Sequence, residues 1–487
     1  MNDRPTTLGA LRESGWRPRT VREELRANLI AALRRDEPLF PGIVGYEDTV
    51  EPALVNALLA GHDLILLGLR GQAKTRLLRG LVRFLDPQLP ALAGAPLNDD
   101  PFAPVSPEGR RILTESGDDA AIRWIPRDER YREKLATPDV SMADLIGDVD
   151  PIRASRRGFS IADEEAVAWG LLPRANRGIM AINELPDLSP RIQVALLNAM
   201  EERDVQVRGL PLRLELDLLL VFSANPEDYT KRGNLITPLR DRIAAQIHTH
   251  YPRDLAAGIA ITRQEAELDR GEVDVLVPEL AREVVEETAR AARESDWIDQ
   301  SSGVSARLTI ALLETAVANA EQRALRLDRD RTTLRLGDLF ASTAAIVGKV
   351  ELVFEGEKEG PERVAEHIIG EAAKRVFDRR FPDFFRADED EANPYEALTE
   401  FVRGGGVLHT DTRRDDEELR AELAAVPSLS SLVARFLPDL ETGAAMFGIE
   451  LLLEGLHRHA ALAKDAGPDG IAFSDLVRGM WDGFERS

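Results

Sequence analysis

Three short apolar runs alternate with segments of helical spacing in the first half of the chain. The runs are predicted to be buried strands, at residues 64–67, 178–182 and 216–222. Apolar positions at helical spacing predict helices near residues 47–60, 77–85 and 189–202. Strands that alternate with helices indicate an α/β domain with a mostly parallel sheet in three layers.

Other patterns place further segments around this sheet. Residues 86–125 are rich in Pro, Gly, Asp and Asn, which predicts an irregular insertion. Residues 203–215 alternate between apolar and polar side chains around Gly209-Leu210-Pro211, which predicts a hairpin. Four parts result: a helical segment at 1–38, the α/β domain at 39–250, a helical domain at 251–350 and a mostly helical region at 351–487.

The composition narrows the class of protein. The 487 residues include 62 Lys and Arg and 85 Asp and Glu, a formal net charge of −23, and 44% are hydrophobic. Such acidity disfavours general binding of nucleic acid, because phosphate contacts need Lys and Arg. The absence of cysteine excludes disulfides and thiolate sites. No apolar run reaches 18 residues and the first residues lack a signal peptide's apolar centre, so we expect a cytoplasmic protein without a membrane span.

The loop after the first strand carries the strongest chemical signal. A strand, a loop with Lys-Thr at its end and a helix form the architecture of a nucleotide phosphate cradle, here for ATP with Mg²⁺. Lys74 is expected to reach the outer phosphates and Thr75 to ligate the metal. The binding residues of this loop are Gly68, Leu69, Arg70, Gly71, Gln72, Ala73, Lys74, Thr75 and Arg76.

This loop departs from the pattern G-x-x-x-x-G-K-[ST] at one position. Ala73 stands where the second glycine is usual, and alanine reaches positive φ only at a cost. The alternative is an ordinary turn between strand and helix with a surface lysine.

Polar residues follow the next two strands, where an open α/β sheet places its site. Glu184 is expected to orient and activate the attacking water, and Asn225 to contact the γ-phosphate or that water. Asn183 is expected in the Mg²⁺ environment, although an aspartate is usual there. The missing charge predicts slower hydrolysis rather than loss of nucleotide binding. The alternatives are an ordinary surface glutamate and a turn beginning at Asn225-Pro226.

Three arginines are candidates to stabilise the transition state. Arg240 and Arg242 lie near the end of the α/β domain, and one of them is expected to act on a neighbouring subunit's nucleotide. Arg307 begins a helix of the next domain and is expected to reach the phosphates. Ion pairing at the surface is the alternative for all three.

In this order, the motifs resemble those of the AAA+ ATPases of the magnesium-chelatase and MoxR branch, over about residues 38–350. Residues 170–178 add to the likeness. The resemblance implies that Ile43 and Val44 contact the adenine, that Asn225 is sensor one, and that Arg307 is sensor two. It also favours Arg242 over Arg240 as the arginine finger.

The resemblance further implies a homo-oligomeric ring, usually hexameric, that binds ATP between subunits and remodels a partner protein. A separate partner with a von Willebrand factor A domain is expected. One alternative is a nucleotide-gated scaffold with weak or no hydrolysis, favoured by Ala73 and Asn183. A nucleic-acid motor is another, supported only by Arg208 and Arg213 on the hairpin.

Overall fold

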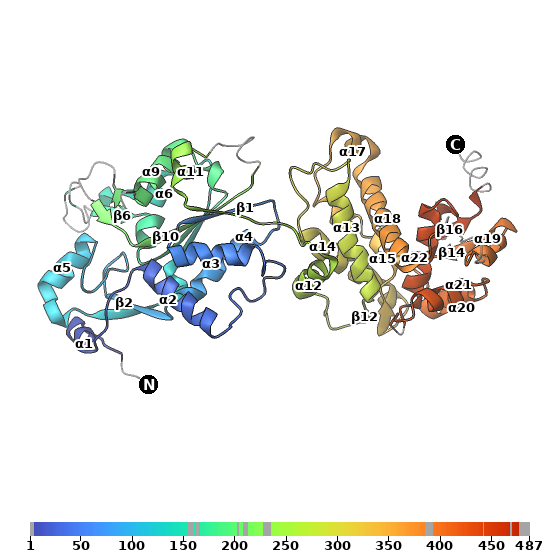
Figure 1. The fold of residues 1–487 in the computed structure, drawn as a ribbon, viewed down its shortest axis with the longest axis horizontal. Helices are drawn as coiled ribbons and strands as arrows, with labels where there is room; N and C mark the ends of the chain where they lie inside the picture. Colours follow the sequence, from blue (N-terminus) through green and yellow to red (C-terminus); the bar gives the residue numbers. More distant parts are fainter. Residues whose placement is uncertain are drawn as a thin grey trace. The chain divides into compact units, whose positions relative to one another are not determined.

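In a computed structural model the chain forms two compact units, residues 1–250 and 251–487 (Figure 1). The structure describes residues 4–152, 160, 163, 166–201, 204–207, 213–226, 235–384, 393–441, 443–467 and 470–476. The hairpin turn, with Arg208 and Gly209-Leu210-Pro211, lies outside them. The boundary between the units coincides with the end of the expected α/β domain, and the finer division into four parts remains a prediction.

The first unit is built on a five-stranded sheet whose paired strands are all parallel, in the order β11-β1-β10-β7-β4. The strands are β1 (Leu64–Leu67), β4 (Tyr131–Leu135), β7 (Gly178–Asn183), β10 (Leu218–Ala224) and β11 (Ala245–His248). The three expected strands are confirmed, as is the parallel sheet.

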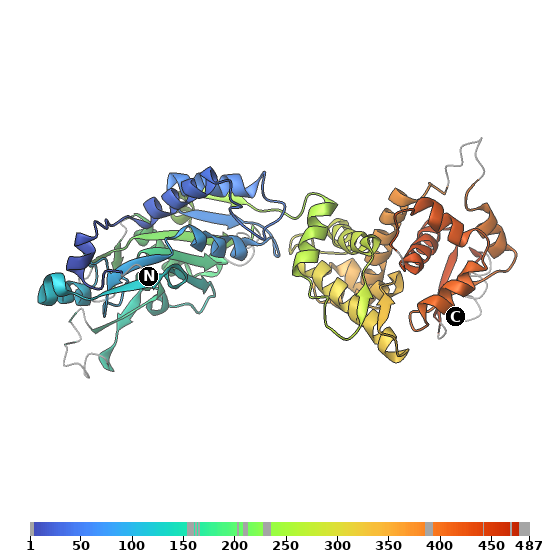
Figure 2. The same cartoon turned by 90° about the horizontal axis from the view of Figure 1, so that it is seen from below.

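Helices cover both faces of the sheet, because side chains alternate along each strand. Leu64 and Leu66 join a core with α2 (Val21–Arg34), α3 (Val50–Ala60) and α4 (Lys74–Gly80). Figure 2 shows these blue helices along one side of the sheet. Ile65 and Leu67 join a second core with α9 (Pro190–Glu201) and α11 (Thr237–Arg242). The three-layer α/β class is therefore confirmed.

Smaller elements complete the first unit. They are α1 (Leu8–Glu13), α5 (Pro107–Ser116), α6 (Met142–Leu145), α8 (Leu171–Arg174), β2 (Gln88–Leu92), β3 (Ile122–Pro126), β5 (Gly147–Val149), β6 (Val167–Trp169), β8 (Asp204–Gln206) and β9 (Arg213–Glu215). The antiparallel pairing of β8 with β9 confirms the expected hairpin.

The expectation of an irregular insertion at residues 86–125 is wrong for both ends of the segment, whereas residues 93–106 contain neither helix nor strand. Strands β2 and β3 pair antiparallel along five residues, with α5 between them. Both carboxylate oxygens of Asp99 accept hydrogen bonds from Ser106, at 2.6 and 2.8 Å, and the Ser106 hydroxyl caps α5. The apolar partners come from α1, far away in sequence, through Leu8 and Leu11. Composition alone shows neither the hydrogen bonds between Asp99 and Ser106 nor the apolar contacts from α1.

The second unit is mainly helical. Its helices are α12 (Leu255–Glu265), α13 (Glu279–Glu294), α14 (Arg307–Arg326), α15 (Leu336–Phe340), α16 (Ala344–Val347), α17 (Phe354–Glu359), α18 (Pro361–Arg380), α19 (Glu396–Arg403), α20 (Asp416–Ala424), α21 (Leu429–Phe436) and α22 (Ala445–Arg458). Helix α18 packs against both α13 and α22, so residues on either side of position 350 share one core.

Two small sheets accompany these helices. Strands β12 (Asp274–Leu276) and β13 (Arg331–Thr333) pair parallel. An antiparallel sheet of order β14-β16-β15 contains β14 (Leu408–Thr410), β15 (Ala463–Gly467) and β16 (Gly470–Ser474). The apolar pattern of the last third did not predict this second sheet.

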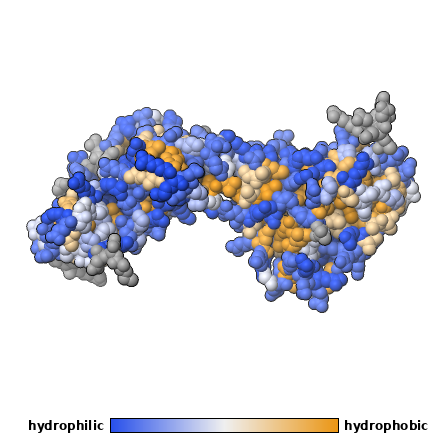
Figure 3. Space-filling view, turned by 60° about the horizontal axis from the view of Figure 1, so that its bottom comes forward, coloured by the Kyte–Doolittle hydropathy of each residue, from blue (hydrophilic) through white to orange (hydrophobic). Residues whose placement is uncertain are grey.

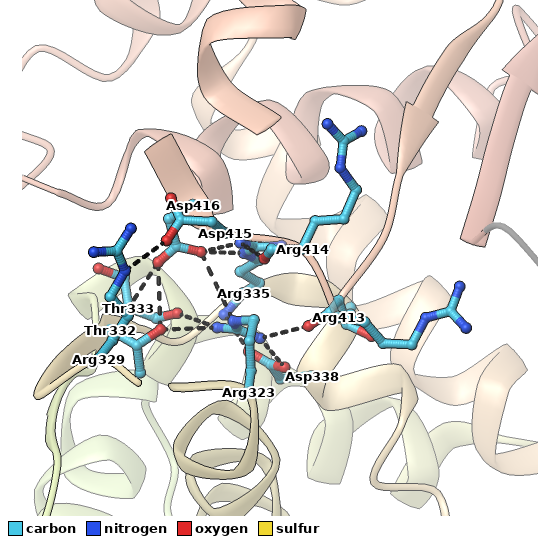
Figure 4. Close-up of polar contacts among 12 residues, drawn as sticks. Arg323, Arg329, Thr332, Thr333, Arg335, Asp338, Arg413, Arg414, Asp415 and Asp416 are labelled. Atoms are coloured by element: carbon cyan, nitrogen blue, oxygen red, sulfur yellow. Dashed lines mark hydrogen bonds and ion pairs between the residues drawn. The ribbon is translucent and has the colours of Figure 1, made fainter. Parts of the chain in front are cut away.

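Buried ion pairs connect distant segments of the second unit (Figure 4). The guanidinium of Arg335 is fully buried, pairs with Asp416 and donates to the carbonyl oxygens of Asp411 and Arg414, at 2.9 and 2.7 Å. Arg323 pairs with Asp338 at 2.7 Å. Buried charges are stable only when paired in this way, so the segment 323–338 is tied to 411–416.

The surface is mostly hydrophilic on the face drawn in Figure 3, with apolar areas between the polar ones. The exposed large apolar side chains belong to different elements, as is usual for a globular surface. Among the described residues, no helix combines the length and the apolar character that crossing a membrane requires.

Candidate nucleotide-binding site

The loop that follows β1 is packed closely against the end of β11. The amide of Gly68 donates to the carbonyl of Ala224 at 3.1 Å. A Cβ at Gly68 would overlap the Thr249 hydroxyl and the Gln72 side chain, which are themselves hydrogen-bonded at 2.7 Å. Glycine is therefore required where the chain leaves the strand. The start of the loop is fixed by Ala224 at the end of β10 and by the hydrogen-bonded pair of Gln72 and Thr249.

The middle of the loop turns through two left-handed residues. Gly71 has φ +74° and Ala73 has φ +54°. An L-residue in this region costs about 1 kcal/mol relative to glycine, so the substitution of Ala73 stores strain without preventing the turn. Ala73 thus has the positive φ at which alanine is expected, from the sequence, to be costly.

Helix α4 begins directly after this turn, with Lys74 as its first residue. The Lys74 side chain is buried, and its ammonium donates to the carbonyls of Gly68 and Leu69, the latter at 2.9 Å. No side chain caps the first turn of α4, since the preceding residue is Ala73. Thr75 is half-buried, whereas Arg70 and Arg76 are exposed. The loop thus holds a lysine ammonium over its own carbonyls.

Three neighbouring strands, β10, β7 and β4, carry polar side chains that are hydrogen-bonded to one another. Asn183 at the end of β7 accepts a hydrogen bond from the Ser223 hydroxyl on β10 at 2.9 Å. Its amide nitrogen donates to a carboxylate oxygen of Glu133 on β4 at 2.7 Å. The chain Ser223–Asn183–Glu133 therefore crosses the carboxyl edge of the sheet, beside α4.

Glu133 is also bound to α4. Its two oxygens accept hydrogen bonds from Arg79 at 2.7 and 3.1 Å, and one accepts from the Tyr131 hydroxyl at 3.3 Å. The hydrogen bond to Glu133 raises the pKa of Arg79. Burial, with a smaller contribution from the Glu133 charge, raises the pKa of Tyr131. Both groups therefore keep their protons near neutral pH.

Glu184 and Asn225 follow β7 and β10 at the same edge. Glu184 is half-buried, has φ +56°, and its amide donates to the Ser223 hydroxyl at 3.4 Å. The side-chain oxygen of Asn225 is buried and accepts no hydrogen bond from any residue that the structure describes. A buried acceptor of this kind normally has a partner, so Asn225 fits a ligand or water at this edge.

The three candidate arginines differ in their contacts. Arg242 pairs with Glu201 and, at 2.7 Å, with Asp241, and its side chain is 44% exposed. Arg240 and Arg307 are exposed, and neither guanidinium has an ion-pair partner in the described part of the chain. Arg307 belongs to the second unit, where it begins α14. The roles of all three remain predictions.

The segment expected to contact the adenine lies before α3. Ile43 packs against the core under α2 and α3, and Val44 is half-buried beside it. The Tyr46 hydroxyl lies 2.9 Å from both the carbonyl of Gln72 and that of His250, which fastens this segment to the loop. Contact with an adenine remains a prediction.

Sequence reasoning missed three of these residues: Glu133, Ser223 and Tyr46. Ser223 was detectable, because it directly follows a predicted strand. Glu133 was not, since nothing in its neighbourhood marks β4 as the strand beside Asn183.

The residues present fit a nucleotide with Mg²⁺. The loop strained at Ala73, the buried ammonium of Lys74 and the Asn225 oxygen, which accepts no hydrogen bond from the described residues, are groups that suit the binding of phosphate. Among the described residues, no group of three or more His, Cys, Asp or Glu is arranged to hold a metal. Mg²⁺ at such sites keeps several waters and takes few protein ligands, so Thr75 and Asn183 are sufficient candidates.

Comparison with known proteins gives one family model and several relatives. A model described as the sigma-54 interaction domain matches residues 154–248. Magnesium-chelatase subunit ChlI of Nostoc sp. is 29% identical over 252 residues, covering 50% of this chain and 63% of that protein. The magnesium-chelatase 38 kDa subunit of Rhodobacter capsulatus is 30% identical over 241 residues, covering 48% and 63%.

This chain thus spans slightly less than two thirds of the length of those relatives. Among solved structures, a model of the complex between subunits BchI and BchD of magnesium chelatase has 22% identity and a TM-score of 0.35, covering 66% of this chain and 98% of that one. Together with the strand, loop and helix at residues 64–80 and the parallel sheet, the matched family model and relatives support an AAA+ ATPase of the magnesium-chelatase and MoxR type, to which this chain is similar.

Proposed function

We propose that the chain binds ATP with Mg²⁺ and hydrolyses it to drive conformational work on a protein partner. Lys74 binds the phosphates, and Thr75 and Asn183 hold the Mg²⁺ environment. Glu184 orients the attacking water, while Asn225 and Arg307 sense the γ-phosphate. Bound Mg²⁺ supplies charge neutralisation on the phosphate oxygens.

One observation supports this proposal most strongly: the buried Lys74 ammonium is held over a loop strained at Ala73. A buried ammonium needs acceptors, and two of those that Lys74 has here are the neutral carbonyl oxygens of Gly68 and Leu69. Phosphate oxygens are stronger acceptors, because they carry charge. The loop is therefore preorganised to exchange these carbonyls for a polyphosphate.

The proposed assembly is a homo-oligomeric ring, usually hexameric, in which Arg242 acts on the neighbour's nucleotide. The proposed partner is a separate protein, with a von Willebrand factor A domain as the first class to test. A nucleotide-gated scaffold with slow hydrolysis is the second candidate, because Ala73 is strained and Asn183 is uncharged. The charge of −23 disfavours a nucleic-acid motor.

Replacing Lys74 by alanine is expected to weaken ATP binding by roughly 10- to 100-fold. This is the effect of losing charge-assisted hydrogen bonds worth about 1.5–3 kcal/mol. Isothermal titration calorimetry with ATP and Mg²⁺ measures it directly. Lys349→Ala, which removes an exposed lysine in the second unit, is the matched control and should leave the affinity unchanged. Equal affinities for the two variants would contradict the assigned role of Lys74.

A further inference from the structure

Asn183 lacks the negative charge that is usual at its position in the proposed site. The family pattern has an acidic residue there, and an amide carries no charge. The structure shows that both polar ends of this amide are engaged: the nitrogen donates to Glu133 at 2.7 Å, and the oxygen accepts from Ser223 at 2.9 Å. The carboxylate nearest to the amide thus stands one strand away, on β4.

The position of Glu133 follows from the sheet register. Glu133 is paired with Ala181, and Leu135 with Asn183, in the parallel ladder between β4 and β7. Residues two apart point to the same face of a strand, so Glu133 and Asn183 share one face. That face also carries α4, through the two hydrogen bonds between Arg79 and Glu133.

Two charges in this cluster are exposed to different degrees. The side chain of Arg79 is 64% exposed and that of Glu133 only 21%. Solvent therefore screens the guanidinium more than the carboxylate. The positive charge of Arg79 therefore cancels the negative charge of Glu133 only in part at the position of Asn183.

We propose that Glu133 is a positioning residue that supplies, from β4, the negative charge that Asn183 lacks. The charge-assisted hydrogen bond from the Asn183 amide to Glu133 polarises that amide and makes its oxygen a stronger acceptor. This oxygen then serves the hydration shell of the nucleotide-bound Mg²⁺. The proposal rests on the nucleotide-binding function proposed above.

A purely structural role is the competing explanation. In that case the pair of Arg79 and Glu133 only fastens α4 to the sheet. The two explanations differ in one measurable quantity, the gain in nucleotide affinity when Mg²⁺ is added. A fastening role affects thermal stability, whereas the proposed role affects the Mg²⁺-dependent gain.

The experiment measures affinity for a non-hydrolysable ATP analogue by calorimetry, with and without Mg²⁺, together with the melting temperature. Glu133→Gln is expected to reduce the Mg²⁺-dependent gain about tenfold and to leave the Mg²⁺-free affinity unchanged. Glu115→Gln is the matched control, because it removes a carboxylate from an exposed ion pair with Arg111 in the same unit. It should change neither affinity.

A charge swap makes the test sharper. Asn183→Asp alone places two carboxylates against each other, which disfavours ionisation of both, so it should not raise the gain. The double variant Asn183→Asp with Glu133→Gln moves the charge back to β7 and should restore the gain. If Glu133→Gln does not fold, Glu133→Asp takes its place. It keeps the charge but withdraws it by one methylene, so the Mg²⁺-dependent gain should fall, by less than tenfold, and an unchanged gain would contradict the inference.

Two results would overturn the inference: an unchanged gain in Glu133→Gln, or no recovery in the double variant. Absence of nucleotide binding by the unaltered chain would instead remove the proposed function. The two failures are therefore distinguishable.

Discussion

Replacing Glu184 by glutamine is expected to lower the ATP turnover number by about 10²- to 10⁴-fold while nucleotide binding is retained. The size is that of removing a general base, and glutamine keeps the shape of the side chain while losing its charge. Glu184 directly follows β7, at the sheet edge that also carries Asn183 and Asn225. Steady-state phosphate release gives the turnover, and calorimetry gives the affinity.

Asp187→Asn is the matched control for this variant. Asp187 ends the short turn Leu185–Asp187 that directly follows Glu184, and it is also half-buried. Its substitution should change turnover by less than tenfold. If Glu184→Gln hydrolyses ATP at the unaltered rate, Glu184 does not activate the water. If the variant binds ATP stably, proteins that co-purify with it identify the partner.

Replacing Arg242 by alanine is expected to lower turnover by roughly 10³- to 10⁵-fold, the range of an arginine finger supplied by a neighbouring subunit. In the isolated chain Arg242 is paired with Glu201 and Asp241. Exposed ion pairs of this kind are worth about 0–1 kcal/mol, so they do not prevent the guanidinium from turning to a neighbour's phosphates.

Mixing variants tests the neighbour's role. Subunits carrying Glu184→Gln and subunits carrying Arg242→Ala are each expected to be nearly inactive alone. In a mixed ring, an intact Glu184 site meets an intact Arg242 at some interfaces, so turnover should recover in part. No recovery would contradict action between subunits.

Arg240→Ala is the matched control for Arg242→Ala, because both side chains are exposed and both belong to the short helix α11. We expect Arg240→Ala to change turnover by less than tenfold. The Arg240 guanidinium has no ion-pair partner in the described part of the chain, so a loss of turnover in Arg240→Ala could not be attributed to a broken ion pair there. If Arg240→Ala is the inactive variant, Arg240 is the finger.

Local signals were sufficient for the sheet and for the loop. Buried parallel strands read as continuous apolar runs, because both faces are covered, and β1, β7 and β10 follow this rule. The Lys-Thr pair at the end of the loop is likewise a local feature. The resemblance to the magnesium-chelatase and MoxR branch rests on the order of such motifs, and that order is a property of the sequence alone.

Local signals failed where the stabilising partner is distant in sequence. Residues 86–125 looked irregular because the apolar side chains that order them come from α1. Strand β4 carries few apolar residues, so its periodicity did not mark it as part of the sheet. The core shared across position 350 is formed by helices 279–294, 361–380 and 445–458, whose contacts no local pattern encodes.

The sequence by itself determined the fold class, the loop between β1 and α4 and the residues that follow the strands, because each depends on near neighbours in the chain. Only the tertiary structure decided which carboxylate stands beside Asn183. Glu133 and Asn183 are 50 residues apart in the sequence. The lateral order of the parallel strands brings the Asn183 amide nitrogen to 2.7 Å from a Glu133 carboxylate oxygen. Strand order results from packing over the whole sheet, so the charge at this edge is a property of the fold rather than of any motif.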